Sequence, residues 1–146
     1  MKVLLQRSGP ASVTVEGQVI GAIDHGLVLL IGIEKHDGQE SLEKMARKVL
    51  NYRVFGDNDG KMNLNVQQVE GGLLCISQFT LAADTKKGLR PGFSCAAVPE
   101  QAETLFEQFV NLLKTTSSCP IETGKFAADM KVSLVNDGPV TFMLEC

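Results

Sequence analysis

The chain has 146 residues, of which 44% are hydrophobic and 21% are charged, and its net charge is −3. This length suits one domain with a real core and is too short for a second, so we expect a single domain over residues 1–146. The negative charge excludes proteins that coat long stretches of nucleic acid, because such binding depends on neutralising many phosphates. We therefore expect no DNA partner, while a partner that offers only one RNA end remains possible.

Apolar runs in the chain are short. The longest, from Leu27 to Ile33, is far below the roughly 20 residues of a membrane-spanning helix. The apolar run Val3 to Leu5 ends at polar Gln6, so the beginning of the chain lacks the hydrophobic region of a secretory signal. We expect a cytoplasmic protein without a membrane partner.

The cysteines are widely scattered and form no CxxC motif, which favours reduced thiols over a disulfide framework or a zinc site. The two histidines are not at metal-binding spacing either. We therefore expect no metal and no cofactor. The residues in question are Cys75, Cys95, Cys119, Cys146, His25 and His36.

The first third of the chain predicts four consecutive antiparallel strands. Lys2 to Gln6 and Ser12 to Glu16 flank a Ser-Gly-Pro break at residues 8–10. Gln18 to Ile23 and Leu27 to Ile33 flank an Asp-His-Gly turn signal at residues 24–26.

Two helices are predicted from apolar spacing. The first runs from Leu42, after Asp37-Gly38-Gln39-Glu40, which we interpret as a capping box. The second begins with Pro99, a residue suited to a first helical position. Its apolar stripe consists of Ala102, Leu105, Phe106, Phe109, Val110 and Leu113.

Strand-like segments also lie between and after the helices: Leu64 to Gln68, Leu73 to Phe79, Ile121 to Thr123, Met130 to Val135 and Val140 to Leu144. The predicted fold class is α+β, with a mainly antiparallel, barrel-like β-sheet and two helices in one domain.

Some candidate sites have simple structural explanations. The segment GFSCA at 92–96 is close to a GxSxG nucleophile elbow, but it lacks the last glycine, and neither histidine is placed to serve Ser94 as a base. Cys95 is a possible thiol nucleophile, although we interpret it as a buried packing residue.

Two further segments suit ligand binding. The loop DTKKGLRPG at 84–92 gathers Lys86, Lys87 and Arg90, which suits either phosphate binding or an ordinary solvated loop. Ser77 and Thr80 fall at the end of an apolar strand, where hydroxyls and free N–H groups can face a ligand.

The segment NDGPVTF at 136–142 sets a glycine and a proline within otherwise strand-like sequence. Proline cannot donate to a β-ladder and is confined to edges, bulges and first positions. A turn is the simplest interpretation.

Together these motifs carry a specific resemblance. SQFTL at 77–81 and NDGPVT at 136–141 resemble the paired signature of the D-aminoacyl-tRNA deacylases. The similarity continues through GKMNLNVQQ at 60–68 and GKFAADMKVSLVNDGPVTF at 124–142. Phe79 and Val140 favour this family over a sibling family that edits L-alanine. Gly92 and Cys95 depart from the family's usual loop sequence.

The resemblance implies a homodimer in which Gly138-Pro139 forms a cis peptide and enters the active site of the partner subunit. Its carbonyl groups would act as a chiral gate that clashes with an L side chain. The implied activity is hydrolysis of the ester of D-aminoacyl-tRNA, and of glycyl-tRNA, at the acceptor end.

By the same resemblance, main-chain N–H groups at Phe79 and Thr80 hold the carbonyl oxygen, and the RNA 2′-hydroxyl helps to activate water. A role for the Thr80 hydroxyl as nucleophile stays open, although it would need an adjacent base. Ser77 and Gln78 line the pocket, and Gln78 is a candidate partner for the terminal nucleotide. Arg7 braces the Gly-Pro segment across the interface. The resemblance also implies a second pocket wall of Ala127, Ala128 and Met130, and we expect the tRNA contacts to come from Lys86, Lys87 and Arg90.

Two other functions fit parts of the sequence. A hydrolase that uses Ser94 or Cys95 would act on a small ester or amide and lose activity when those residues change. A non-catalytic module would bind tRNA ends without turnover.

Overall fold

The computed structural model describes residues 1–86 and 88–146. The elements in chain order are β1 (Lys2–Val15), β2 (Gln18–Ile23), β3 (Gly26–Gly32), α1 (Gln39–Asn51), β4 (Phe55–Gly56), β5 (Met62–Leu64), β6 (Gly72–Ser77), the short 3₁₀ helix η1 (Phe79–Ala82), α2 (Pro99–Thr116), β7 (Ile121–Thr123) and β8 (Lys131–Glu145).

The main sheet has the order β2-β1-β3-β6-β7, and β8 pairs with the other edge of β1. The pairs of β1 with β2, β3 and β8 are antiparallel, whereas β6 is parallel to both β3 and β7. The parallel pairs arise because α1 lies between β3 and β6 in the chain, and α2 between β6 and β7, as crossover connections. The sheet is therefore mixed, and the predicted antiparallel character holds only for the pairs of β1.

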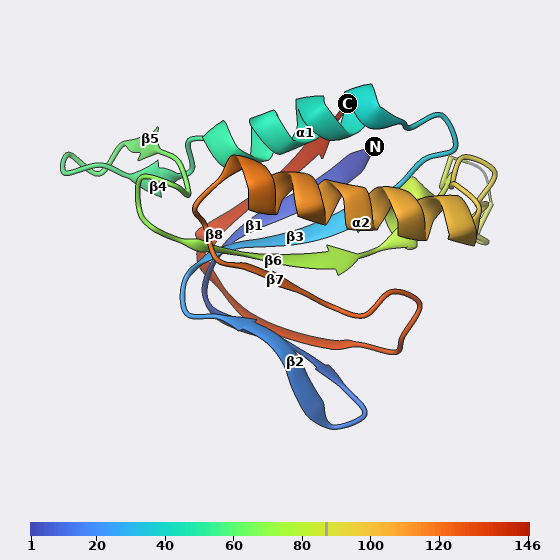
Figure 1. Ribbon diagram of the computed structural model, residues 1–146, viewed down its shortest axis with the longest axis horizontal. Coiled ribbons are helices and arrows are strands. Elements are labelled where there is room, and N and C mark those ends of the chain that lie inside the picture. Colours follow the sequence, from blue (N-terminus) through green and yellow to red (C-terminus); the bar gives the residue numbers. More distant parts are fainter. Residues whose placement is uncertain (87) are drawn as a thin grey trace.

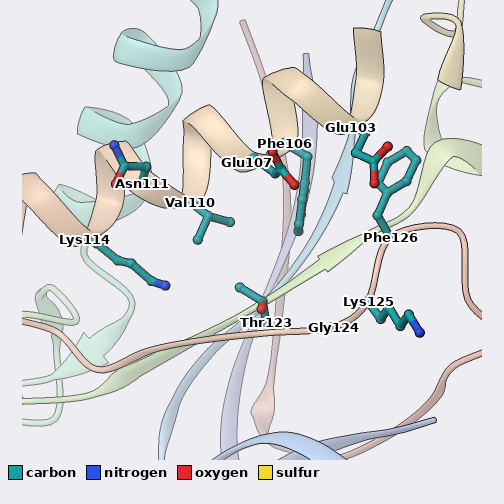
Figure 2. Close-up of a pocket in the computed structure, with 10 residues that line it drawn as sticks. All are labelled: Glu103, Phe106, Glu107, Val110, Asn111, Lys114, Thr123, Gly124, Lys125 and Phe126. Carbon is teal, nitrogen blue, oxygen red and sulfur yellow. The ribbon is translucent and has the colours of Figure 1, made fainter. Parts of the chain in front are cut away.

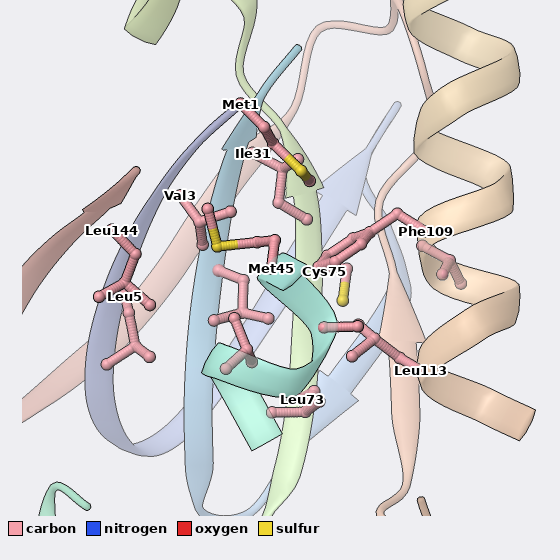
Figure 3. Packing of buried hydrophobic residues seen from close by; sticks show 14 of the residues in the cluster. Met1, Val3, Leu5, Ile31, Met45, Leu73, Cys75, Phe109, Leu113 and Leu144 are labelled. Atoms are coloured by element: carbon pink, nitrogen blue, oxygen red, sulfur yellow. The ribbon is translucent and has the colours of Figure 1, made fainter. Parts of the chain in front are cut away.

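Both α-helices lie on one face of this sheet (Figure 1). Every position of the predicted α2 stripe is buried, and so are Met45, Ala46, Val49 and Leu50 on α1. These side chains form one cluster with apolar residues of β1, β3 and β6 (Figure 3). The prediction of both helices from apolar spacing is confirmed.

The predicted capping box is wrong. Gly38 occupies the N-cap of α1, and no side chain forms a capping hydrogen bond there. Asp37 instead accepts hydrogen bonds from the Glu34 N–H and the Met1 amino group, each at 2.7 Å. Its carboxylate ties the beginning of the chain to the segment before α1.

β1 and β8 are each one long strand where we predicted two, because the breaks are β-bulges. Gln6 pairs with Thr141 and Ser8 pairs with Asn136, so Arg7 alone faces residues 137–140 of β8. A second shift between Ser8 and Ala11 accommodates Gly9 and Pro10. Bulges accommodate residues, such as proline, that cannot form the hydrogen bonds of a regular β-ladder. Here they accommodate both of the proline-containing segments that we predicted as breaks.

The predicted strand from Leu64 to Gln68 is largely wrong. Only Met62–Leu64 forms a strand, paired with Phe55–Gly56 in a small hairpin. The next residues form a turn in which Asn65 Oδ1 accepts the N–H groups of Gln67 and Gln68. Asparagine favours such turns because its short side chain bonds to nearby backbone groups.

The two ends of the main sheet approach each other. A Cβ added to Gly21 of β2 would lie 2.8 Å from the carbonyl oxygen of Thr123 on β7. Only a residue without a side chain permits this approach. The sheet is therefore nearly closed, which agrees with the predicted barrel-like sheet.

All four cysteines are free, but their environments differ. Cys75 is fully buried, and burial raises the pKa of its thiol to about 12. Cys95 is exposed, so our interpretation of Cys95 as a packing residue is wrong. Among the described residues, no helix is both long and apolar enough to cross a membrane.

Candidate functional site

The end of β6 is followed at once by the tight turn of η1. Ser77 pairs with Ile31 at the last position of the ladder, and the Gln78 N–H donates to the Ile31 carbonyl at 2.7 Å. The turn lies against Gly32, where an added Cβ would be 2.9 Å from the Leu81 Cβ. The absence of a side chain at Gly32 thus allows η1 to pack directly on β3.

η1 presents main-chain N–H groups at its beginning. Its first hydrogen bond runs from the Leu81 N–H to the Gln78 carbonyl, at 3.2 Å. The N–H groups of Phe79 and Thr80 precede that bond and cannot have a partner inside the helix. They are the donors that the family resemblance implies for an oxyanion site.

The Thr80 hydroxyl is already engaged, because Thr80 Oγ1 accepts a hydrogen bond from Gln78 Nε2 at 2.6 Å. This bond ties the Gln78 side chain to the turn. Thr80 does not line the pocket described next, whereas Ser77, Gln78 and Phe79 do.

A second wall is formed by the loop between β7 and β8. The Gly124 N–H donates to the Cys75 carbonyl at 3.0 Å, which fixes the start of the loop to β6. A Cβ on Gly124 would lie 2.5 Å from Met130 Sδ, so glycine makes room for that side chain. Ala127 has a left-handed backbone with φ of 57°.

These two walls enclose a cavity of about 530 Å³, which we call the strand-end pocket. It brings together predicted residues that lie some 50 positions apart in the chain, and the beginning of α2 completes it. Its lining is mostly apolar: Ile76, Ser77, Gln78, Phe79, Ala97, Pro99, Ala102, Phe126, Ala127, Ala128, Asp129, Met130 and Val132.

A second cavity of about 450 Å³, which we call the α2 groove, adjoins the first and shares Phe126 with it. Figure 2 shows the carboxylates of Glu103 and Glu107 on its α2 side, facing the segment that carries Thr123 and Gly124. Lys114 and Lys125 also line the groove. Two carboxylates and two lysine ammonium groups therefore line the groove beside the strand-end pocket.

Arg7 holds the Gly-Pro segment within one chain. Its Nε donates to the Asp137 carbonyl at 2.9 Å, and Nη1 donates to the Val54 carbonyl at 2.7 Å. The Val140 N–H donates to Asn136 Oδ1 at 2.8 Å, which satisfies a backbone group that the bulge removes from the ladder. The Gly138–Pro139 bond is cis, as the resemblance implied.

The Gly-Pro segment lies far along the sheet from the strand-end pocket of the same chain. Arg7, opposite this segment, pairs with Leu27, which pairs with Leu73 near the start of β6, whereas the pocket lies at the end of β6. In Figure 1, β8 bends at the end of the sheet opposite the β6 arrowhead. Within residues 1–86 and 88–146, the pocket is lined without Arg7, Gly138 or Pro139.

The basic loop is closed at its neck by two backbone hydrogen bonds. The Asp84 and Gly92 N–H groups each donate to the other's carbonyl, at 2.7 and 3.0 Å. Lys86 and Arg90 are exposed between them, and Lys87 lies outside the described residues. Ser94 and Cys95 are exposed beyond the neck.

The described residues contain no group of three or more His, Cys, Asp or Glu side chains that could hold a metal ion. The strand-end pocket instead has mostly apolar walls, and η1, whose first N–H groups have no partner inside the helix, begins at its edge. Such a site is typical of hydrolases that stabilise an oxyanion with N–H groups.

Comparison with known families identifies the particular hydrolase. A family model described as D-Tyr-tRNA(Tyr) deacylase matches residues 4–145. The chain belongs to this family, which confirms the resemblance in its motifs.

Similar curated proteins bear the name D-aminoacyl-tRNA deacylase. The protein of Saccharophagus degradans is 72% identical over 99% of both chains. That of Marinomonas sp. is 63% identical over 99% of this chain and 100% of its own.

Solved structures share the fold. One titled c-Myc DNA Unwinding Element Binding Protein has a TM-score of 0.96 and 45% identity, covering 100% of this chain and 99% of its own. Another, of a probable eukaryotic D-amino acid tRNA deacylase, has a TM-score of 0.84 at 15% identity, covering 98% and 97%. The second likeness concerns the fold alone.

The sequence analysis did not identify several residues of the strand-end pocket and of the Gly-Pro segment. Ala97 and Pro99 line the pocket because α2 begins beside it, which no local pattern indicates. Asn136 was part of the quoted motif, but its bond to Val140 follows only from the bulge. Phe93 was detectable as an aromatic residue directly after the basic loop, and it contacts Phe79.

Proposed function

We propose that the protein hydrolyses the ester of D-aminoacyl-tRNA, and of glycyl-tRNA, at the acceptor end, releasing the free amino acid and tRNA. The observation that carries this proposal is the strand-end pocket, which joins the SQFTL turn to the 124–130 loop in a chain of the deacylase family. The protein would act in the cytoplasm as a proofreading enzyme of translation.

The reaction requires little from side chains because an aminoacyl ester is already activated. In the proposed mechanism, the Phe79 and Thr80 N–H groups bind the ester carbonyl oxygen and stabilise its negative charge in the transition state. A water oxygen attacks the carbonyl carbon with help from the RNA 2′-hydroxyl, and the ribose 3′-oxygen leaves with a proton. Ser77 and Gln78 border the reacting group.

Thr80 is a poor nucleophile in this arrangement. Its hydroxyl oxygen accepts from Gln78, and an amide N–H cannot take the proton that a nucleophilic hydroxyl must lose. Asp129 is the titratable side chain in the pocket lining, but it is exposed and forms an ion pair with Lys131 at 3.0 Å. The RNA-assisted route therefore has better support.

Chiral selection is assigned to Gly138 and Pro139 of a partner subunit in a homodimer. Both residues are exposed in the bulge, and Arg7 and Asn136 hold the residues beside them. Because the segment lies at the other end of β6 from the pocket of its own chain, we assign it to the pocket of another copy. Carbonyl groups placed against the substrate α-carbon would exclude L side chains of any kind.

The contacts to tRNA are assigned to Lys86, Lys87 and Arg90. An enzyme that grips only the acceptor end needs few phosphate contacts, which is compatible with a net charge of −3. Ala127, Ala128 and Met130 would form the wall opposite the SQFTL turn.

The test is the rate at which the purified protein, without added metal, deacylates D-tyrosyl-tRNA and L-tyrosyl-tRNA under identical conditions. We expect rapid loss of the D ester and an intact L ester. Equal hydrolysis of both esters would contradict the chiral gate, and hydrolysis of neither would contradict the deacylase function.

The same assay separates the alternatives. A Ser94→Ala, Cys95→Ala double variant should keep its activity on D-tyrosyl-tRNA, because both residues lie outside the strand-end pocket lining. Loss of activity would favour a serine or cysteine hydrolase. Tight binding of D-tyrosyl-tRNA without turnover would favour a non-catalytic binding module.

A further inference from the structure

Two aromatic side chains lie in contact on the surface beside the strand-end pocket. Phe79 is 59% exposed and Phe93 is 40% exposed. Their ring centroids are 5.1 Å apart, with an angle of 50° between the planes. Phenylalanine rings contribute most to stability when their large apolar area is buried, so this pair contributes little to the core.

The backbone holds both rings in place. Phe79 is the first residue of η1, which packs directly on β3 at Gly32. Phe93 follows Gly92, which is paired with Asp84 at the neck of the basic loop, and its carbonyl accepts the Ala96 N–H at 3.1 Å. The pair is therefore a fixed surface that adjoins the pocket through Phe79.

Charge around the pocket differs between its two sides. On the side of the aromatic pair, the loop closed by Asp84 and Gly92 exposes Lys86 and Arg90, while Asp84 Oδ1 accepts the Lys86 N–H. On the other side, the α2 groove carries Glu103 and Glu107 together with Lys114 and Lys125, so the charged side chains of its lining carry no net charge. A polyanion that reaches the pocket is thus favoured on the side of the rings.

We propose that Phe79 and Phe93 form a stacking platform for a nucleobase at the single-stranded 3′ end of the RNA that carries the ester. The phosphates of that end run towards Lys86 and Arg90. This inference rests on the proposed function and specifies how the site holds its RNA. Every base has a π-face, so an aromatic platform accepts RNA ends with little dependence on sequence.

The first test compares Phe93→Leu with Phe93→Tyr. Leucine keeps an apolar side chain but cannot stack, whereas tyrosine keeps the ring. We expect Phe93→Leu to raise the KM for D-tyrosyl-tRNA by about 5- to 150-fold, the range for loss of one base–aromatic stack, with kcat within about twofold. Phe93→Tyr should retain the wild-type KM.

Leu89→Ala is the matched control. Leu89 lies in the same loop and is fully exposed, but it is not an aromatic residue. Its KM should stay at the wild-type value, and the melting temperatures of all three variants should match the wild type. An unchanged KM in Phe93→Leu, or an equal rise in Leu89→Ala, would overturn the platform.

A second measurement does not depend on hydrolysis. A short single-stranded RNA with 2-aminopurine as its 3′-terminal base loses fluorescence when that base stacks. Wild type and Phe93→Tyr should quench it, and Phe93→Leu should need about 5- to 150-fold more protein for the same effect. Equal quenching by Phe93→Leu would contradict the proposal.

Together the measurements separate the two proposals. If the wild type hydrolyses D-tyrosyl-tRNA but Phe93→Leu behaves like it in both tests, only the platform fails. If the wild type quenches the RNA through Phe93 but hydrolyses neither ester, the platform stands and the proposed function fails.

Discussion

At the scale of single residues, Thr80 has a side-chain hydroxyl and a main-chain N–H, to which we assign different roles in catalysis. Its hydroxyl accepts a hydrogen bond from Gln78, and its main-chain N–H precedes the first hydrogen bond of η1. Side-chain motifs alone draw attention to the hydroxyl, whereas the mechanism proposed above depends on the N–H.

Two substitutions at this position separate the groups. Thr80→Val removes the hydroxyl and should lower kcat for D-tyrosyl-tRNA by less than about tenfold, because the N–H remains. Thr80→Pro removes the N–H of the second residue of η1, which has no partner inside that helix. It should lower kcat by about 10²- to 10³-fold, the usual cost of losing one oxyanion donor. The opposite order would assign the chemistry to the hydroxyl.

Cys75 carries a second prediction, on stability at alkaline pH. Burial raises the pKa of its thiol to about 12 from 9.0, so the folded protein keeps a proton that the unfolded chain releases above pH 9. Stability from this group is complete below pH 9 and is lost as pH rises towards 12. The loss from pH 8 to pH 10 should be about 1 kcal/mol.

Urea unfolding of the wild type and Cys75→Ala at both pH values measures this loss. We expect the variant to be less stable than the wild type at each pH. Its stability should fall less from pH 8 to pH 10, because it lacks the Cys75 thiol and shares all other titrating groups with the wild type. Identical pH dependence would show that Cys75 does not titrate in this way.

At the scale of elements, the packing of η1 on β3 positions the proposed donors. Gly32→Ala would bring a Cβ within 2.9 Å of the Leu81 Cβ and 3.2 Å of the Gln78 carbonyl, so η1 must shift. We expect a loss of about 1–3 kcal/mol in unfolding free energy. A fall in kcat/KM of at least about tenfold should accompany it, because small displacements at a site are costly.

Gly56→Ala is the control for this change. The nearest atoms to its Cβ belong to Gly60 at 4.0 Å, an ordinary contact. It should alter stability by less than about 0.5 kcal/mol and leave kcat/KM unchanged. Full activity of Gly32→Ala would show that the position of η1 is not critical.

Elements differed in how well the sequence predicted them. Both helices followed from apolar spacing, since their buried stripes are continuous. The strands β1 and β8 were each divided at a proline, because a bulge and a turn have the same local composition. The parallel pairing of β3 with β6 depends on a crossover through α1, which local patterns do not reveal.

The same limit applies to the site. Ser77 to Thr80 were recognisable at a strand end from the apolar run before them. Ala127, Ala128 and Met130 have no chemical signature, and only the family resemblance indicated them. The position of this wall depends on the absence of a side chain at Gly124, which leaves space for the Met130 side chain. The sequence alone does not indicate that these two residues are in contact.

At the scale of the whole molecule, the proposal requires two copies. The pocket and the Gly-Pro segment lie at opposite ends of β6, so under this proposal one chain does not supply both parts of a site. Each site would combine the pocket of one subunit with the gate of the other.

This arrangement predicts complementation. A Gly138→Ala side chain would meet Val140 Cγ2 at 2.7 Å and Arg7 Nη2 at 3.1 Å, so the segment must move. Gly138→Ala should then hydrolyse D- and L-tyrosyl-tRNA with altered selectivity, and Thr80→Pro should hydrolyse neither.

Unfolded and refolded together in equal amounts, the two variants should form mixed dimers with one intact site. D-selective activity should then reach about a quarter of the wild-type value by statistical pairing. No gain over the separate proteins, or a monomeric mass in sedimentation, would contradict a shared site.

The close approach of Gly21 to Thr123 also bears on solubility. Unpaired strand edges are templates for aggregation, and here β2 and β7 shield each other's edges. Gly21→Val should force the two strands apart, because a Cβ would lie 2.8 Å from a backbone oxygen. We expect that variant to form large assemblies on concentration, detectable by light scattering, while the wild type stays dispersed. This outcome would show that the absence of a side chain at Gly21 protects the protein from self-association through these strand edges.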